Sequence, residues 1–336
     1  MKAFVTGASG FIGNHLVRRL LQNDWQVSIL RHQKALEGCE ECRVFQGDIK
    51  DPRSLKDMFK RIDVLFHLAA ALGSFRIGKE EFFAINAQGT ENVLKAAADA
   101  GVGKVIHFSS AGVLGSVKKN KPVGETHPPS PRDVYDRTKL EGEKIALRFA
   151  SRGENVAVIR PGWVYGPGDR RTFKLIRAVA DKKFILVTKG NTRQTPVYID
   201  DLLQGILLCA EKAASGEIFH LAGREDLTVK EITQAIARAA NVSLSQFPLP
   251  LFALKAAAWK WEKAYALLGK EAPLTRGKLA FFIHPKPLSI QKAITDLGYA
   301  PRWSFEKGIA AAVRWYRQKR WLPPPPSSQA SFSPQE

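Results

Sequence analysis

Little cysteine, a shortage of acidic residues and the absence of long apolar runs mark this chain. Only 3 of its 336 residues are cysteines, which indicates a reducing, cytoplasmic environment. No apolar run approaches the ~18–20 residues that would cross a bilayer. The apolar stretch at residues 3–5 is too short for a signal peptide, so we expect none. With 45% hydrophobic residues, the chain can form one large α/β domain with a smaller appendage.

Basic residues outnumber acidic ones, 51 to 32, and give a formal net charge of +19. Between Leu251 and Arg320 there are fourteen Lys and Arg against four acidic residues, so about half of the excess lies in the last quarter. An anionic membrane surface, nucleic acid or a generally basic proteome would each account for this charge. Of the two kinds of partner, we expect peripheral membrane contact more than nucleic acid.

Two of the cysteines form a single Cys-x-x-Cys pair, Cys39 and Cys42. A zinc site would need a second pair of ligands, and His32 is the only candidate nearby in the sequence. We therefore interpret the pair as part of a loop that leads into a strand at 43–45, and we expect no metal site.

Short apolar runs alternate with helical patterns over the first two-thirds of the chain, which predicts an α/β fold with a doubly wound, Rossmann-type parallel sheet. The expected strands are 2–6, 26–30, 43–46, 64–68, 104–109, 156–160 and 217–221. Helical patterns cover 12–21, 82–100, 171–180, 201–213, 229–240, 251–268 and 305–317, and a further strand is expected at 196–199. The Pro- and Ser-rich segment 323–336 is predicted to be disordered.

A glycine-rich turn separates the first strand from the first helix. Gly7, Gly10 and Gly13 have the spacing Gly-x-x-Gly-x-x-Gly. In such a turn the helix N-terminal amides face a pyrophosphate, and side chains would block the phosphate or hold helix and sheet apart. The turn therefore predicts a dinucleotide site, with contacts from Gly7, Ser9, Gly10, Phe11, Ile12 and Gly13.

The end of the second strand bears on which dinucleotide is bound. NAD-binding folds place an acidic residue there for the ribose 2′-hydroxyl, whereas this chain has Arg31 and no acid from 30 to 33. Arg31 would pair with a 2′-phosphate, so NADP is favoured over NAD; the alternative is a solvated surface arginine. Further cofactor contacts are expected from Asp48, which could accept from the adenine amino group, and from Ile49, Leu68, Ala69 and Ala70.

Tyr135 and Lys139 lie four residues apart, about one helical turn, and Ser110 follows the strand expected at 104–109. A free tyrosine has a pKa of ~10, too high for a good base near neutrality. An ammonium nearby would stabilise the phenolate and lower that pKa, and Lys139 could also hold the nicotinamide ribose. Ser110 would donate to the substrate oxygen. The three residues predict hydride transfer with a nicotinamide cofactor.

The chain resembles the extended short-chain dehydrogenase/reductases over nearly all of residues 1–320. The segments that carry the resemblance are 6–13, 47–49, 67–70, 86–90, 108–115, 135–139 and 160–168. The resemblance implies that Ser110, Tyr135 and Lys139 are catalytic, with Tyr135 and Lys139 also contacting the cofactor. It further implies that Asn86 lies close to the active site and contacts the cofactor, and that Pro161 and Val164 lie along the nicotinamide.

Two departures weaken a sugar-nucleotide interpretation within this family. Nucleotide-sugar epimerases usually have Asn where this chain has Trp163, and an Arg-Asp pair where it has Gln194 and Thr195. The segments 273–276, 289–293 and 297–301 instead resemble the 3β-hydroxysteroid dehydrogenase-like and dihydroflavonol reductase-like branch. The resemblance thus implies an oxidoreductase that interconverts a secondary alcohol and a ketone on an apolar, steroid- or terpenoid-like small molecule.

Two other functions stay open. One is a nucleotide-sugar epimerase or dehydratase, in which the cofactor is oxidised and reduced within one turnover. The other is a non-catalytic NAD(P)-binding protein that contacts RNA or a membrane, although such relatives often lose the Tyr or the Lys. A homodimer is also considered.

The expected domain organisation is an NAD(P)-binding domain at 1–165, with its core completed by 195–240. Residues 166–194 and 241–320 would form a smaller, substrate-binding lobe. Within that lobe, one helical stripe with lysines beside it is formed by Leu251, Leu254, Ala258, Trp261, Tyr265 and Leu268. A packed lid helix over the active site is the plainer interpretation, and a membrane-interface helix is the alternative.

Overall fold

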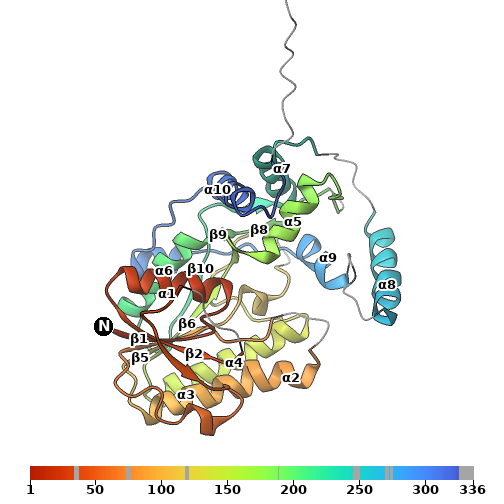
Figure 1. The fold of residues 1–336 in the computed structure, drawn as a ribbon. Helices are drawn as coiled ribbons and strands as arrows, with labels where there is room; N and C mark the ends of the chain where they lie inside the picture. The colour runs from red at the N-terminus through yellow and green to blue at the C-terminus, as the bar shows by residue number, and fades with distance from the viewer. Residues whose placement is uncertain are drawn as a thin grey trace, which may run out of the picture.

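A seven-stranded parallel sheet forms the centre of the molecule (Figure 1), in a computed structural model that describes residues 1–33, 38–72, 77–117, 121–187, 189–244, 250–268, 272 and 275–324. The strand order is β10-β6-β5-β4-β1-β2-β3, and every pairing within this sheet is parallel. Its strands are β1 (Lys2–Thr6), β2 (Gln26–Arg31), β3 (Arg43–Gln46), β4 (Val64–His67), β5 (Lys104–Phe108), β6 (Val156–Pro161) and β10 (Ile218–Leu221). The predicted doubly wound sheet is confirmed.

Helices cover both faces of this sheet, so its strands are buried on both sides. They are α1 (Phe11–Gln22) and α6 (Ile199–Lys212) on one face, and α3 (Gly89–Asp99) and α4 (Val134–Ser151) on the other. Alternate residues of β1 illustrate the two cores: Ala3 and Val5 pack on the α1 side, and Phe4 packs on the α3 side. Burial on both faces explains why these strands read as continuous apolar runs.

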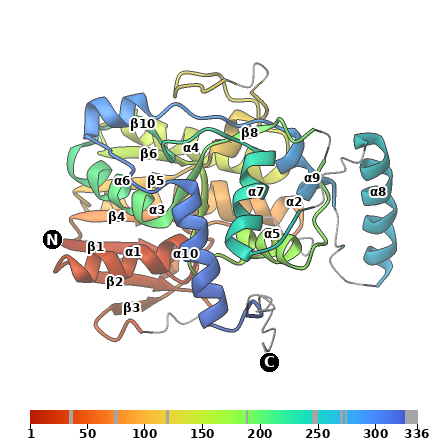
Figure 2. The same ribbon diagram turned by 90° about the horizontal axis from the view of Figure 1, so that it is seen from above.

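A second group of elements lies at the carboxyl ends of the strands. It contains β7 (Trp163–Tyr165), α5 (Arg170–Ala180), β8 (Arg193–Gln194), β9 (Pro196–Tyr198), β11 (Leu227–Thr228), α7 (Val229–Ala240) and α10 (Phe305–Gln318). Helix α7 packs against α5 and α10 (Figures 1 and 2). Within residues 195–240, α6 and β10 belong to the sheet layers and α7 belongs to this second group; the predicted domain boundaries stay a prediction.

Helix α10 fastens the segment that follows β7. The Tyr316 side chain is fully buried, and its single hydroxyl proton is shared between the carbonyl oxygens of Asp169 (2.7 Å) and Gly166 (3.0 Å). Asp169 in turn caps α5 by accepting from the backbone N–H groups of Arg171 and Thr172. Tyr316 of α10 thus holds the segment that leads into α5.

Helices α8 (Leu251–Leu267) and α9 (Arg276–Ile283) form the outermost part of the second group. Leu254 and Ala258 of α8 are buried in a small cluster with Leu279 of α9 and Val187. In both Figure 1 and Figure 2, α8 stands at the edge of the molecule beyond α9. The predicted stripe on α8 is therefore a packing face at Leu254 and Ala258.

Several local features differ from the prediction. The helix expected at 82–100 is divided into α2 (Lys79–Phe83), a π-helical turn (Ala84–Gln88) and α3. The short strands β7, β8 and β11 and helix α9 were not predicted, because runs of two or three residues and a helix of 8 residues with its apolar residues in one continuous run carry little periodic signal. Most of the tail 323–336, and residues 273–274, lie outside the described residues.

Cys39 and Cys42 are joined by a disulfide in the turn before β3. The prediction of a loop at this position is confirmed. The disulfide itself differs from the reduced state that the low cysteine content led us to expect. Both residues are buried in the core on the α1 side of the sheet.

The glycine-rich turn between β1 and α1 is closely packed. Gly7 has a φ of +74°, and a Cβ there would meet the backbone of Leu68 and Ala69. A Cβ on Gly13 would overlap the Gly7 carbonyl oxygen and the Ala8 backbone. The two glycines therefore allow α1 to start directly against the sheet.

Gly13→Ala should destabilise the fold, because the added methyl group must push α1 away from β1. We expect a loss of about 1–3 kcal/mol, typical of overpacking, measured as a lower midpoint of denaturant unfolding. Gly124→Ala is the matched control, since a Cβ there meets nothing within 4 Å. Equal stability of the two variants would contradict the packing argument.

Candidate functional site

The candidate site lies where the strand order reverses, between β1 and β4. In open α/β sheets, ligands bind outside the carboxyl ends of the strands at this point. The glycine turn follows β1 there, and the half-buried residues Leu68, Ala69 and Ala70 follow β4. Gly10 is the N-cap of α1, and no side chain caps this helix. Its first N–H groups are therefore available to an anion, which fits the dinucleotide predicted from the sequence.

The structure brings the predicted catalytic residues together. Ser110 follows β5, and its hydroxyl oxygen accepts from the Gly112 N–H (3.0 Å) and is hydrogen-bonded to the phenol of Tyr135. Asp133 caps α4 by accepting from the Asp136 N–H (2.8 Å). With Asp133 as the N-cap, α4 begins at Val134, so Tyr135 lies in the first turn of the helix, at the sheet edge.

Lys139 lies one turn after Tyr135 and is buried. Its ammonium donates to the Phe108 carbonyl oxygen at the end of β5. Burial lowers the pKa of Lys139 to about 8, and the nearby Glu143 carboxylate acts in the opposite direction. Its charge at neutral pH therefore depends on a second buried group.

The pKa of Tyr135 differs from the expectation. Burial raises it above its usual value, and the largest opposing effect comes from the positive charge of Arg171, followed among the lowering effects by the hydrogen bond with Ser110. The sequence led us to expect Lys139 in that role, but its ammonium is bonded to the Phe108 carbonyl. Arg171, in the first turn of α5, was missed because it is 36 residues from Tyr135 in sequence and belongs to no motif that we used.

A buried ion pair attaches α4, the helix that carries Tyr135 and Lys139, to the central sheet. Arg160 of β6 donates two hydrogen bonds to Glu143 of α4, from Nη2 to Oε1 (2.6 Å) and from Nε to Oε2 (2.9 Å). Both side chains are at most 3% exposed. Ser109 also donates to Glu143 Oε2 (2.5 Å), and Arg160 Nη1 donates to the Glu125 carbonyl (3.1 Å). The pair thus joins β6 to α4 and, through Ser109, to the end of β5, next to Ser110 in the chain and one helical turn from Lys139.

The Asn86 side chain links two segments of the site by hydrogen bonds. Its side-chain oxygen accepts from the Ala71 N–H (2.7 Å), and its amide nitrogen donates to the Ala71 carbonyl (3.2 Å) and to the Thr138 hydroxyl (3.0 Å). The side chain is fully buried, with both ends engaged by the protein. Asn86 thus joins the segment after β4 to the catalytic helix, and its contact with the cofactor stays a prediction.

The adenosine side of the predicted site carries exposed polar groups. Arg31 Nε donates to Gln46 (2.9 Å), whose amide donates to the His32 carbonyl (2.7 Å). The Asp48 carboxylate lies near the His32 ring (3.4 Å) and the Lys50 ammonium (3.9 Å). Gln46 thus orients the Arg31 guanidinium at the end of β2, and Asp48 stays partly exposed beside it.

An aromatic cluster borders the other end of the site. Trp163 of β7 packs edge-on against Phe281 of α9, with ring centres 4.9 Å apart, and also contacts Phe305 at 6.0 Å. Its indole N–H donates to the Thr172 hydroxyl (3.1 Å). Pro161 and Val164, predicted to lie along the nicotinamide, are half-buried on either side of Trp163.

Gln194 and Thr195 are both buried and used internally. The Gln194 amide donates to the carbonyls of Phe281 and His284, each at 3.0 Å. The Thr195 hydroxyl accepts from the Leu288 N–H (2.9 Å). These two positions therefore hold α9 and the following segment in place.

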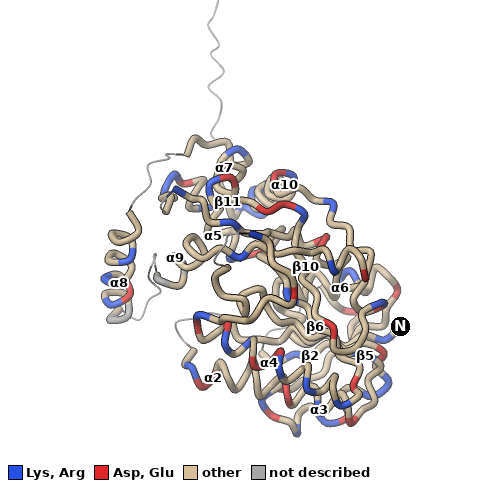
Figure 3. The backbone as a smooth tube through the Cα atoms, turned by 180° about the vertical axis from the view of Figure 1, so that it is seen from behind, with Lys and Arg blue, Asp and Glu red and all other residues tan. Residues whose placement is uncertain are grey.

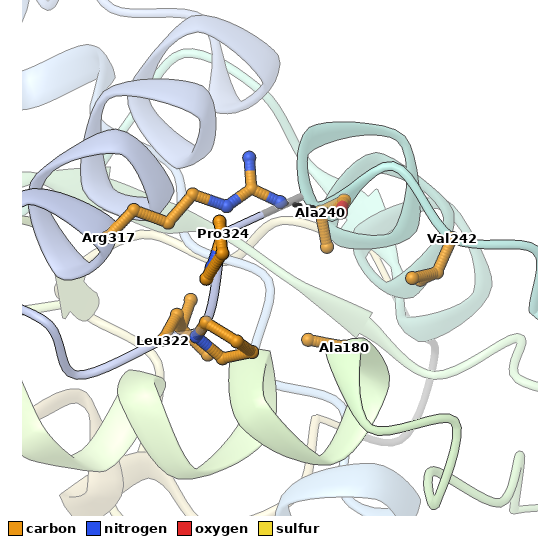
Figure 4. Close-up of a pocket in the computed structure, with 7 residues that line it drawn as sticks. Ala180, Ala240, Val242, Arg317, Leu322 and Pro324 are labelled. Atoms are coloured by element: carbon orange, nitrogen blue, oxygen red, sulfur yellow. Dashed lines mark hydrogen bonds between the residues drawn. The ribbon is translucent and has the colours of Figure 1, made fainter. Parts of the chain in front are cut away.

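A small cavity of about 40 Å³ lies elsewhere, among α5, α7 and the end of α10 (Figure 4). Ala180, at the far end of α5 from Arg171, is one of its lining residues. Arg317 spans the cavity and donates to the Ala240 carbonyl (2.7 Å). A space of this size holds a few water molecules at most, and it is separate from the catalytic residues.

Among the described residues, no helix is both long and apolar enough to cross a membrane.

Comparison with known proteins identifies relatives along most of the chain. The profile of the NAD dependent epimerase/dehydratase family matches residues 3–222. A 4-hydroxy-2-methyl-3-oxo-4-farnesyl-3,4-dihydroquinoline-1-oxide ketoreductase of Stigmatella aurantiaca is 29% identical, over 93% of this chain and 95% of the relative. A 3β-hydroxysteroid dehydrogenase/Δ5→4-isomerase of Mycobacterium tuberculosis is 28% identical, over 94% of this chain and 90% of the relative.

Solved structures show the same fold. The crystal structure of gox2253 has a TM-score of 0.80 and 28% identity, covering 94% of this chain and 98% of that one. The dTDP-glucose 4,6-dehydratase DesIV of Streptomyces venezuelae, solved with bound NAD, has a TM-score of 0.77 and 27% identity. It covers 97% of this chain and all of its own.

Glu143→Gln should both destabilise the protein and change the charge of Lys139. Breaking a buried pair on one side leaves Arg160 uncompensated, which costs about 3–5 kcal/mol in unfolding free energy. Loss of the carboxylate should also move the pKa of Lys139 below about 8, so any activity that needs the ammonium should fall at lower pH than in the wild type.

The control is the double variant Glu143→Leu, Arg160→Met, which removes both charges and should recover much of the lost stability. Denaturant unfolding and the pH profile of turnover measure the two effects separately. A pH profile of Glu143→Gln identical to that of the wild type would contradict the electrostatic role of Glu143.

Proposed function

Because the chain belongs to the NAD dependent epimerase/dehydratase family and is an NAD-dependent enzyme of the extended short-chain dehydrogenase type, we propose that it interconverts a secondary alcohol and a ketone on an apolar substrate. The observation that carries this proposal is the grouping of Ser110, Tyr135 and Lys139 at the sheet edge, with the aromatic side chain of Trp163 in the segment that follows β6. The two relatives described above act, by their names, on a farnesylated quinoline oxide and a 3β-hydroxysteroid.

In ketone reduction, Tyr135 gives its phenolic proton to the carbonyl oxygen as that oxygen gains negative charge. Ser110 donates a hydrogen bond to the same oxygen and holds it beside the phenol. The nicotinamide, when bound, supplies the hydride to the carbonyl carbon. Arg171 provides positive charge that stabilises the resulting phenolate, and in the oxidation direction every proton step is reversed.

Trp163 supports an apolar substrate. Its ring packs edge-on against Phe281, and its indole N–H donates to Thr172, the residue after Arg171, so β7 and α9 place aromatic carbon on the Arg171 side of the site. Gln194 and Thr195 are buried in internal hydrogen bonds, which leaves neither as a polar partner for a sugar nucleotide. Sites for apolar ligands combine such walls with a few polar groups that fix orientation.

Tyr135→Phe tests the acid–base assignment. The substitution removes the transferable proton and little else, so cofactor binding should persist while turnover falls about 10²–10⁴-fold. The measurement is steady-state NAD(P)H oxidation with ketone substrates, beside a cofactor titration by fluorescence. Retained turnover with intact cofactor binding would remove Tyr135 from the mechanism.

The same assay separates net redox chemistry from epimerisation. A ketone reductase consumes added NAD(P)H over many turnovers, whereas an epimerase or dehydratase returns its cofactor to the starting state within each turnover. Conversion of UDP- or dTDP-sugars without net NAD(P)H consumption would favour the sugar-nucleotide enzymes to which the fold is also similar.

For the cofactor, we propose a preference for NADP within the NAD-type site. Gln46 holds Nε of Arg31 and so directs the other guanidinium nitrogens outward from the end of β2. Such a fork suits the two oxygens of a 2′-phosphate. The partly exposed Asp48 is suited to the adenine amino group.

Arg31→Asp should weaken NADPH binding far more than NADH binding, because it replaces attraction to the 2′-phosphate with repulsion. Dissociation constants for both cofactors, measured on each variant, give the ratio. Arg152→Asp at the end of α4 is the control, with the same charge change on an exposed arginine. Equal loss for both cofactors in Arg31→Asp would identify Arg31 as a surface charge only.

A further inference from the structure

Helix α8 exposes an unusual set of side chains on the face turned away from α9. Phe252 and Trp259, two turns apart, are 78% and 47% exposed, and Leu254 and Ala258 occupy the buried side. Trp261, at the margin of the packed side, is also 45% exposed. Isolated exposed apolar residues are normal on proteins, but three large aromatic side chains on one projecting helix are not.

Positive charge surrounds these aromatic side chains. Lys255, Lys260 and Lys263 are exposed on the same helix, and the Lys263 ammonium lies 4.3 Å from the centre of the Trp259 ring. Helical spacing places Lys263 one turn beyond Trp259 and Lys255 one turn before it. Figure 3 shows the basic positions distributed along α8, at the edge of the molecule.

We propose that this outward face of α8 (Phe252, Lys255, Trp259, Lys260 and Lys263) docks on the surface of an anionic lipid membrane. Tryptophan and phenylalanine settle at the boundary between headgroups and acyl chains, while lysines reach back to the headgroups. The net charge of +19 adds long-range attraction to such a surface. A second copy of this chain would bring the same lysines face to face, which disfavours self-association through this face.

The position of α8 relates this contact to the catalytic site. Its buried face packs on Leu279 of α9, and two residues further along α9, Phe281 contacts Trp163 beside the catalytic residues. A membrane-docked α8 would therefore place the aromatic border of the site close to the phase in which an apolar substrate dissolves. Membrane docking itself is argued from the outward face of α8 alone. Only the advantage for an apolar substrate rests on the proposed reaction.

Co-sedimentation of the full chain with vesicles tests the proposal. Binding is expected to phosphatidylcholine vesicles that contain phosphatidylglycerol, but not to phosphatidylcholine alone, and high salt should reverse it. Each lysine near an anionic surface contributes roughly fivefold to partitioning. Reversal of Lys255, Lys260 and Lys263 to Glu should therefore weaken binding about 100-fold or more.

The matched control reverses Lys2, Lys56 and Lys95, exposed lysines of the sheet domain, and changes the net charge equally. It should keep most of the binding. Equal loss in both triple variants would overturn the proposal, because attraction would then come from overall charge. Absence of binding to anionic vesicles at low salt would overturn it as well, and so would a dimer that dissociates in Trp259→Ala without any vesicle binding.

A second readout does not depend on charge reversal. Brominated acyl chains quench tryptophan only when the ring enters the bilayer, so wild-type fluorescence should fall on such vesicles. Replacing Trp259 and Trp261 by Phe should remove most of that quenching, whereas replacing the half-buried Trp25 should not. Turnover with a water-soluble ketone, without vesicles, should be unchanged in these variants, which separates failure of docking from failure of the proposed reaction.

Discussion

The buried ion pair between Arg160 and Glu143 is the interaction on which the catalytic arrangement depends. It joins β6, and through Ser109 the end of β5, to α4, the helix that carries Tyr135 and Lys139. A buried pair is rarely the most stabilising choice at such a position, because the desolvation of two ions offsets their attraction. Here its directional hydrogen bonds also reach Ser109 and the Glu125 carbonyl, so it fixes orientation as well as charge.

The Glu143 carboxylate of the same pair also helps the buried Lys139 side chain to stay protonated. An ammonium removed from water tends to lose its proton, and a carboxylate one turn further along the helix opposes that tendency. Burial also favours the neutral form of Tyr135, and because the charged form of tyrosine is an anion, this raises its pKa. The positive charge of Arg171 opposes this increase in the Tyr135 pKa, and Arg171 lies on α5, whose start is held in place by Tyr316 of α10. The chemistry thus draws on charges from both halves of the molecule.

Much of the sheet could be predicted from sequence, because strands buried on both faces appear as short apolar runs and the glycine turn marks where they begin. The same reasoning located Ser110, Tyr135 and Lys139, whose order and spacing are local. It failed where partners are distant in sequence: the Glu143–Arg160 pair, the link formed by Asn86 and the approach of Arg171 all depend on tertiary packing. The disulfide between Cys39 and Cys42 was also missed, since two cysteines in a loop do not reveal their redox state.

Tyr316 has a consequence for how the enzyme matures. Its hydroxyl holds the Gly166 and Asp169 carbonyls that precede α5, yet it lies near the end of the chain. Chains emerge from the ribosome N-terminus first, so the sheet strands up to β6 are available for pairing long before α10 is made. The segment that carries Arg171 can be fastened only after α10 has been synthesised. A nascent or C-terminally clipped chain can therefore hold a formed sheet and still lack a finished site.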